Sequence, residues 1–237
     1  MGVALMLTAN ARFRVVTERT VVAMPEARIG WCAGASHFLS KLNNHLGFYM
    51  ALTGKQLKSK DVIFSGVATH FVPRARLQEL ELELIHWKAD DIETSLNAFS
   101  EPLEEFSLYP FIKDIDYCFS ADTVEEIIEK LEKIDSEWSK EALEMMASLC
   151  PTMLKVSLRA LQIGKSLDLK SGLRMLYRIW YRSIGSYNAQ EGLKSISASG
   201  ADRPRWQPGT LADVTDAMVD WYFEPLPDTE ELRFYDD

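Results

Sequence analysis

Residues 21–30 read Val21-Val22-Ala23-Met24-Pro25-Glu26-Ala27-Arg28-Ile29-Gly30, and this stretch decides the fold. The β-branched pair at its start predicts a short strand, because such side chains favour extended backbone. Pro25 ends that strand, since proline cannot donate to a ladder. Glu26 follows at the strand end, flanked by apolar residues. A carboxyl group there is expected to have a raised pKa and to serve as an acid or base, the alternative being a purely structural role.

Short elements surround this stretch. Residues 13–17 and 67–72 are strand-like, and Pro73 stops the second run. Residues 36–54 show helical spacing of their leucines, and a further short helix is predicted over 59–65. The first 72 residues are therefore interpreted as the part of the chain that contains strands.

After Pro73 the apolar spacing predicts helices almost throughout. Asp122 followed by Glu125 is interpreted as a helix N-cap with its reciprocal partner, and Pro151 suits a first helical turn. We expect residues 100–110 and 199–210 to be loops, and the acidic tail after Pro225 to be frayed. The predicted helices cover residues 77–87, 111–119, 124–134, a segment from Pro151, 167–187, a short segment near Ala189, and 214–223.

The net charge of −9 argues against a nucleic-acid-binding domain, although the charge is unevenly distributed. Residues 1–78 hold ten Lys and Arg against three Asp and Glu, whereas residues 79–144 hold five against twenty. The acidic run is interpreted as the solvated face of several helices, or as a docking surface for a basic partner. No stretch approaches the roughly 20 apolar residues that a membrane span needs, so no membrane contact is expected.

Metal binding and nucleophile-elbow chemistry are not predicted. The four histidines include no pair at helical spacing and none lies near a cysteine pair, so no zinc motif is present. The three cysteines are far apart and form no ligand set or disulfide framework. No Gly-x-Ser-x-Gly elbow occurs.

A series of motifs runs in order along nearly the whole chain. Together they resemble the 3-hydroxyisobutyryl-CoA hydrolase family of the crotonase (enoyl-CoA hydratase/isomerase) superfamily, with closest likeness to plant members. The motifs are Arg12 to Glu18, Ala23 to Gly30, Ala51 to Gly54, Gly66 to Val72, Cys118 to Ser120, Thr123 to Ile128, Pro151 to Arg159, Tyr177-Arg178, Glu191-Gly192 and Pro204 to Trp206.

The resemblance implies an α/β crotonase-like (ClpP/crotonase) fold. Residues 1–72 would be the C-terminal part of the crotonase core, and residues 73–237 the helical C-terminal region. It also implies hydrolysis of a 3-hydroxyacyl-CoA thioester in valine catabolism, with no cofactor because CoA is part of the substrate. Glu26 matches the catalytic glutamate of the family's Met-Pro-Glu motif. Gly2 and Val3 align with the glycine run that supplies an oxyanion-hole N–H.

Several departures from the family predict little or no activity. The family's loop aspartate, its second catalytic acid, is missing, and no acid lies between Glu26 and Asp61. Val3 stands where the functional glycine is expected, and its branched side chain would crowd a ligand. Residues 1–7 are interpreted as the remnant of an oxyanion-hole strand and turn. Met1 then coincides with an internal methionine of the fold, so the fold is expected to be incomplete, with exposed strand edges and low stability.

Two other functions stay open. The first is a catalytically inactive structural homologue, such as a mitochondrial ribosome-associated component, which is the only reading that involves nucleic acid. The second is an enoyl-CoA hydratase or isomerase. The family implies a mitochondrial location, or a peroxisomal one in plant-like cases, although this chain shows no targeting signal. The sequence does not determine the oligomeric state.

Overall fold

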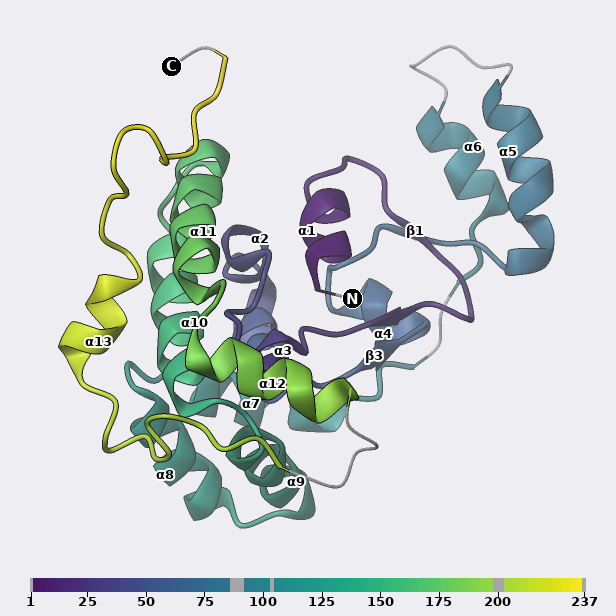
Figure 1. Ribbon diagram of the computed structural model, residues 1–237. Coiled ribbons are helices and arrows are strands. Elements are labelled where there is room, and N and C mark those ends of the chain that lie inside the picture. Colours follow the sequence, from purple (N-terminus) through teal and green to yellow (C-terminus); the bar gives the residue numbers. More distant parts are fainter. Residues whose placement is uncertain (1, 86–91, 103–104, 198–202, 236–237) are drawn as a thin grey trace.

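The computed structural model describes residues 2–85, 92–102, 105–197 and 203–235, and it is mainly helical (Figure 1). Its strands are two residues long and occur before residue 72. The part up to that residue contains α1 (Val3–Ala9), β1 (Val15–Val16), β2 (Val21–Val22), the 3-10 helix η1 (Glu26–Ile29), α2 (Ser36–Leu39), η2 (Asn43–His45), α3 (Leu46–Thr53), β3 (Leu57–Lys58), α4 (Lys60–Phe64) and β4 (His70–Phe71).

The segment that follows Gly2 is a helix, which corrects the interpretation of residues 1–7 as a strand and turn. Gly2 has a φ of 58°, and its N–H donates to Ala23 O over 3.1 Å, so the turn is present but leads into α1. Leu5 and Ala9 are buried four residues apart, whereas Leu7 is exposed. One face of α1 is therefore buried. Seven residues make only about two turns, which is too short for the helical spacing of apolar residues to be recognised in the sequence.

The strands form two separate pairs. β1 runs parallel to β4, with Val15 opposite His70, and β2 runs antiparallel to β3, with Val21 opposite Lys58. The predicted strands at 13–17 and 67–72 are present but shorter, and β3 was not predicted. More than a third of the surface of Val15 and Val21 is exposed, as expected for strand edges.

The predicted helix over 36–54 is divided into α2, η2 and α3. Asn44 and His45 have φ values of 54° and 49°, which no α-helix accommodates, so the chain turns between the helices. The turn brings Gly47 against Leu39, where a Cβ atom on Gly47 would lie 1.9 Å from Leu39 O. The predicted helix over 59–65 is confirmed as α4.

The helical remainder matches the predicted pattern with two omissions, α6 and α9. Figure 1 shows α5 and α6 as a hairpin set apart from the main body. Trp87, predicted to extend α5, and residues 199–202 of a predicted loop lie outside the described residues. The elements are η3 (Arg74–Arg76), α5 (Leu77–Ile85), α6 (Ile92–Phe99), η5 (Tyr109–Phe111), α7 (Ile112–Phe119), α8 (Val124–Ile134), α9 (Glu137–Ala147), α10 (Pro151–Gly164), α11 (Leu169–Ser183), α12 (Tyr187–Ser197) and α13 (Asp216–Trp221).

The N-cap of α8 is Thr123 and not Asp122. The Thr123 side chain accepts a hydrogen bond from Glu126 N, and Glu126 Oε2 accepts one from Asp122 N. The cap therefore lies one residue further along than predicted, and the glutamate side chain returns to the N–H of Asp122, the residue before the cap, instead of to the cap itself. Pro151 occupies the first turn of α10, as predicted.

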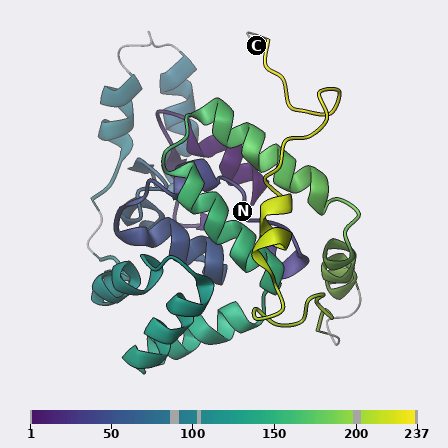
Figure 2. The ribbon, with the colours of Figure 1, turned by 90° about the vertical axis from the view of Figure 1, so that its left-hand side faces the viewer.

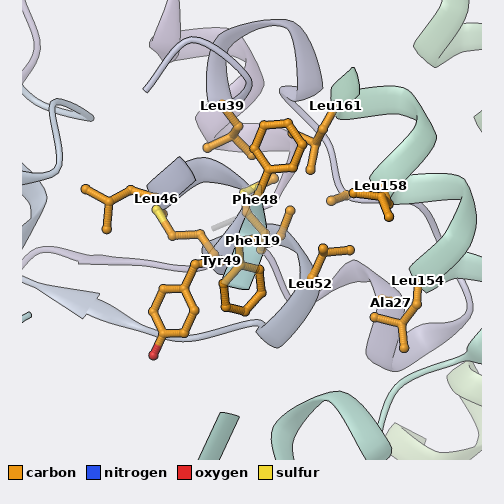
Figure 3. Packing of buried hydrophobic residues seen from close by; sticks show 14 of the residues in the cluster. Ala27, Leu39, Leu46, Phe48, Tyr49, Leu52, Phe119, Leu154, Leu158 and Leu161 are labelled. Carbon is orange, nitrogen blue, oxygen red and sulfur yellow. The ribbon is translucent and has the colours of Figure 1, made fainter. Parts of the chain in front are cut away.

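A continuous core joins the two parts of the chain. Figure 3 shows Phe48, Tyr49 and Leu52 of α3 packed near Phe119 of α7 and the leucines of α10. The same cluster contains Leu5 of α1 and Tyr222, which follows α13. This core contains residues from both sides of residue 72. The division into two domains at that residue stays a prediction.

The C-terminal segment is anchored, contrary to the frayed tail that was predicted. It runs beside α11 (Figures 1 and 2), where Glu231 forms an ion pair with Arg178 at 2.8 Å. The Arg174 guanidinium also donates to Leu232 O over 3.3 Å. These basic side chains of α11 hold the acidic tail.

Candidate active site

Glu26 begins the 3-10 helix η1, and residues 23–25 separate it from the end of the strand β2, which is shorter than predicted. Pro25 caps this helix, and Gly30 ends it with a φ of 73°. Gly30 cannot be replaced without conflict, because a Cβ atom there would lie 2.4 Å from Asn188 O of α12. The reversal at Gly30 carries the following loop, residues 31–35, back over the Glu26 carboxylate.

The two oxygens of the Glu26 carboxylate have different surroundings. The side chain is buried, with only 6% of the residue exposed. Oε1 accepts a hydrogen bond from Gly34 N over 3.2 Å. Oε2 is also buried, and it has no hydrogen-bond partner within the described part of the chain.

Burial raises the pKa of Glu26 to about 6, against the opposing effect of backbone hydrogen bonds that include the one from Gly34. A carboxyl group with this pKa is mostly ionised at neutral pH, and it accepts protons more readily than an ordinary glutamate does. With Oε1 held by a backbone N–H, Oε2 is the oxygen suited to take a proton or to attack a carbon atom.

Two glycines leave space for this carboxylate. A Cβ atom on Gly2 would lie 3.1 Å from Glu26 Oε1, and one on Gly34 would lie 3.2 Å from the same atom. The structure thus brings Gly2 beside Glu26, although the two residues were predicted as a site on family resemblance alone. A side chain at either glycine would therefore crowd the carboxylate, and the positive φ of Gly2 favours glycine there in addition.

Val3 is the first residue of α1, next to Gly2. The first N–H groups of a helix have no acceptor within that helix, so its backbone N–H is suited to bind an oxyanion. The side chain of Val3 is outside what the structure describes, and the predicted crowding of a ligand by that side chain stays a prediction. The oxyanion role of Gly2 and Val3 is likewise a prediction.

The loop after Glu26 contains no acidic residue. Residues 27–60 contain no Asp or Glu, and the next acid, Asp61, accepts hydrogen bonds from Ser107 N and Ser107 Oγ at 2.9 and 2.6 Å. The next acid after Glu26 along the chain is therefore already engaged elsewhere. The absence of the loop aspartate follows from the sequence, and no neighbouring acid in the sequence compensates for it.

The loop over the carboxylate contains side-chain contacts that sequence reasoning missed. Ser157 of α10 accepts a hydrogen bond from Ala33 N, and the Trp180 indole of α11 donates one to Cys32 O. The partners are separated by 124 and 148 residues, so no local spacing could reveal them. These contacts place two helices of the C-terminal part beside Glu26.

The three thiols are buried, and burial raises their pKa values: that of Cys32 to about 12, and those of Cys118 and Cys150 to about 11. They are therefore protonated at neutral pH and unsuited to nucleophilic catalysis. Within the described ranges, no three His, Cys, Asp or Glu side chains are grouped so as to hold a metal ion. No helix of that part of the chain is long and apolar enough to cross a membrane.

The fold and the buried carboxylate define a protein of the crotonase class. Residues 1–223 match the family model described as enoyl-CoA hydratase/isomerase. The chain therefore belongs to the enoyl-CoA hydratase/isomerase family, which the motifs around Glu26 predicted.

Curated relatives include 3-hydroxyisobutyryl-CoA hydrolases. The mitochondrial enzyme of Gallus gallus is 36% identical over 236 residues, which cover 95% of this chain and 61% of that protein. The probable 3-hydroxyisobutyryl-CoA hydrolase 2 of Arabidopsis thaliana is 38% identical over 252 residues, which cover 99% of this chain and 66% of that protein. The chain thus spans less than two thirds of the length of these relatives.

Solved structures show the same fold. A carnitinyl-CoA dehydratase from Mycobacterium thermoresistibile superposes with a TM-score of 0.90 at 33% identity, covering 100% of this chain and 68% of that one. An enoyl-CoA hydratase from Rhodobacter sphaeroides gives a TM-score of 0.85 at 31% identity, covering 99% and 68%. The crotonase-like fold predicted from the motifs is therefore confirmed.

Proposed function

We propose that the protein hydrolyses a short 3-hydroxyacyl-CoA thioester of the 3-hydroxyisobutyryl-CoA type, with Glu26 as the catalytic carboxylate. The observation that carries this proposal is the buried carboxylate with one oxygen bound to Gly34 N and the other without a partner in the described residues. The hydrolase names of the curated relatives, 36% and 38% identical, support this reaction over hydration or isomerisation.

Glu26 Oε2 acts as a base in the simplest form of this reaction. It takes a proton from water, and the hydroxyl oxygen attacks the thioester carbonyl carbon. The carbonyl oxygen becomes an oxyanion near the N–H groups at the start of α1. The C–S bond then breaks, and the CoA sulfur leaves with the proton that Glu26 returns. The products are a hydroxy acid and CoA, so atoms and charges balance without any cofactor.

We expect the rate to be low, because a second acid that would assist this proton transfer is missing. Loss of one acid or base from such a site typically costs about 10²- to 10⁴-fold in rate. A slow reaction that depends strictly on Glu26 is therefore the expected behaviour.

The test is hydrolysis of 3-hydroxyisobutyryl-CoA, followed through the release of the CoA thiol. The chain itself is compared with Glu26→Gln and with the control Glu132→Gln, which alters an exposed glutamate of α8. Slow turnover by the chain and the control, lost in Glu26→Gln, supports the proposal. Equal rates in all three proteins, or no turnover above the uncatalysed rate, contradicts it. Hydration of crotonyl-CoA at a higher rate than hydrolysis of 3-hydroxyisobutyryl-CoA would favour the hydratase alternative. Binding of the thioester without turnover would favour the inactive homologue.

We also propose a mitochondrial location, which the mitochondrial hydrolase of Gallus gallus supports, and a role in valine breakdown, which rests on the family resemblance alone. Imaging of the tagged native gene product against mitochondrial and peroxisomal markers tests the location. A peroxisomal signal would contradict it.

A further inference from the structure

One peptide unit in the loop over Glu26 is held at both ends by side chains from distant helices. The unit joins Cys32 to Ala33. Its N–H donates to Ser157 Oγ of α10 over 3.1 Å, and its carbonyl oxygen accepts from Trp180 Nε1 of α11 over 3.3 Å. Because a peptide unit is planar, two hydrogen bonds on its opposite ends fix its orientation.

Ser157 is buried and holds the loop through its hydroxyl group. Only 1% of the residue is exposed, and its hydroxyl also donates to Cys32 Sγ over 3.5 Å. A buried N–H without a partner costs about 1–3 kcal/mol, so the Ala33 N–H keeps this acceptor as long as the loop stays folded.

Trp180 holds the same loop through its ring as well as its N–H. A Cβ atom on Gly34 would lie 3.2 Å from Trp180 Cζ2 and 3.2 Å from Glu26 Oε1. The indole and the carboxylate therefore enclose Gly34 closely. Trp31, at the start of the loop, packs against the same indole with ring centroids 6.3 Å apart.

The next N–H along the chain is that of Gly34, which donates to Glu26 Oε1. Only the φ and ψ angles of Ala33 separate the fixed Cys32–Ala33 peptide from the Gly34 N–H, so the two helices restrict where that N–H can point. The direction of the Gly34 N–H determines that Oε1 is the oxygen that accepts a hydrogen bond. Oε2 is then the oxygen without a partner in the described part of the chain.

We propose that Ser157 and Trp180 are positioning residues for Glu26, holding the Cys32–Ala33 peptide so that the Gly34 N–H stays on Oε1 and Oε2 remains the reactive oxygen. This inference rests on the proposed role of Glu26 and deepens it. It makes α10 and α11 part of the catalytic site, and not only a cover for the crotonase core.

The test measures the titration of the Glu26 carboxyl carbon by NMR in protein with ¹³C-labelled glutamate, the resonance being assigned from its absence in Glu26→Gln. The variants are Ser157→Ala and Trp180→Phe. The controls are Ser183→Ala, which removes a buried hydroxyl bonded to its own helix at Ile179 O, and Trp221→Phe on the exposed side of α13. Cys32, a titratable group that interacts with Glu26, remains a thiol throughout the titration.

Loss of either support is expected to loosen the Gly34 hydrogen bond and raise the Glu26 pKa by about half a unit or more, since that bond favours the charged form. The controls keep the value of the parent, and Ser157→Thr, which retains the hydroxyl, returns the pKa toward it. If Ser157→Ala does not fold, the Glu26 pKa of Trp180→Phe alone tests the proposal, because a phenyl ring preserves most of the packing of the indole.

Folded variants whose Glu26 pKa equals that of the parent would overturn the positioning role. The measurement requires no turnover. A chain without hydrolase activity therefore contradicts the proposed function, whereas an unchanged pKa contradicts this inference alone.

Discussion

Gly192 of α12 lies directly against the backbone of Ile29, at the end of the 3-10 helix that begins with Glu26. A Cβ atom on Gly192 would lie 2.3 Å from Ile29 C, a distance that no side chain tolerates. Gly30, which follows Ile29, is equally close to α12, because a Cβ atom on Gly30 would lie 2.4 Å from Asn188 O. Two glycines thus allow α12 to approach η1 until the backbones touch, and this approach fixes the helix that carries the Glu26 carboxylate.

Gly192→Ala is expected to lower the free energy of unfolding by about 1–3 kcal/mol, the usual cost of overpacking a close contact. Alanine favours a helix over glycine by about 1 kcal/mol, which offsets only part of this loss. Urea denaturation at pH 7.5 measures the change. Gly209→Ala is the control, because a Cβ atom there lies 3.7 Å from Trp206 O, an ordinary contact. A Gly192→Ala protein as stable as the control would contradict the proposed close packing.

The raised pKa of Glu26 predicts a dependence of stability on pH. The folded state holds the Glu26 proton up to a pKa of about 6, whereas the unfolded state releases it near 4.5. The folded state therefore binds more protons between these values, and the contribution of Glu26 to stability is full below pH 4.5 and lost as the pH rises through 6. The loss amounts to about 2 kcal/mol.

Glu26→Gln carries no titrating group and is expected to remove this part of the pH dependence. Urea denaturation of both proteins at intervals from pH 4.5 to 7.5 measures it. The unfolding free energy of the parent should fall by about 1.6 kcal/mol more across this range than that of the variant. Parallel pH profiles would show that the Glu26 pKa is ordinary.

The cap of α8 offers a direct comparison of two neighbouring residues. Thr123→Ala removes the acceptor for the Glu126 N–H and is expected to cost about 1 kcal/mol of stability. Asp122→Ala is the matched control, because Asp122 takes part through its backbone N–H and carbonyl, which alanine retains. Thermal denaturation of both variants measures the difference. A larger loss in Asp122→Ala would restore the cap position predicted from the sequence.

The helices of the second half could be predicted because their signals are local. The apolar stripe of α8 and the proline that opens α10 each lie within a few turns of chain, and both elements form where predicted. The omitted helix α9 is capped by Ser136 and Ser139, a pair of serines in place of the more familiar Ser and Glu. Its beginning therefore carried a weaker signal.

The candidate site could be predicted only in part. Glu26 was found because its position after a strand and a proline is a local pattern, and because its motif resembles a family. Its supports, Ser157 and Trp180, are an ordinary serine and tryptophan on amphipathic helices, and only the packing of α10 and α11 brings them to the loop. Likewise, the basic face of α11 gave no indication that the acidic tail covers it.

Glu231 connects the C-terminal tail to α11. The Glu231 carboxylate is largely buried, with 16% of the side chain exposed, and it accepts hydrogen bonds from the Arg178 guanidinium at 2.8 Å and from Leu226 N at 3.2 Å. Hydrogen bonds to a charged group contribute about 1.5–3 kcal/mol each, and Glu231→Gln removes the charge that strengthens both.

Glu231→Gln is expected to release the tail while the rest of the fold stays intact. Hydrogen exchange of the backbone amides of Leu226 and of residues 228–232 should become faster by about tenfold or more, a change equivalent to about 1.4 kcal/mol of local stability. Exchange in α10 should stay as in the parent. The control is Glu224→Gln, an exposed glutamate between α13 and the anchored residues. Equal exchange of the tail in both variants would mean that apolar contacts such as the burial of Leu226, and not the ion pair, hold it to α11.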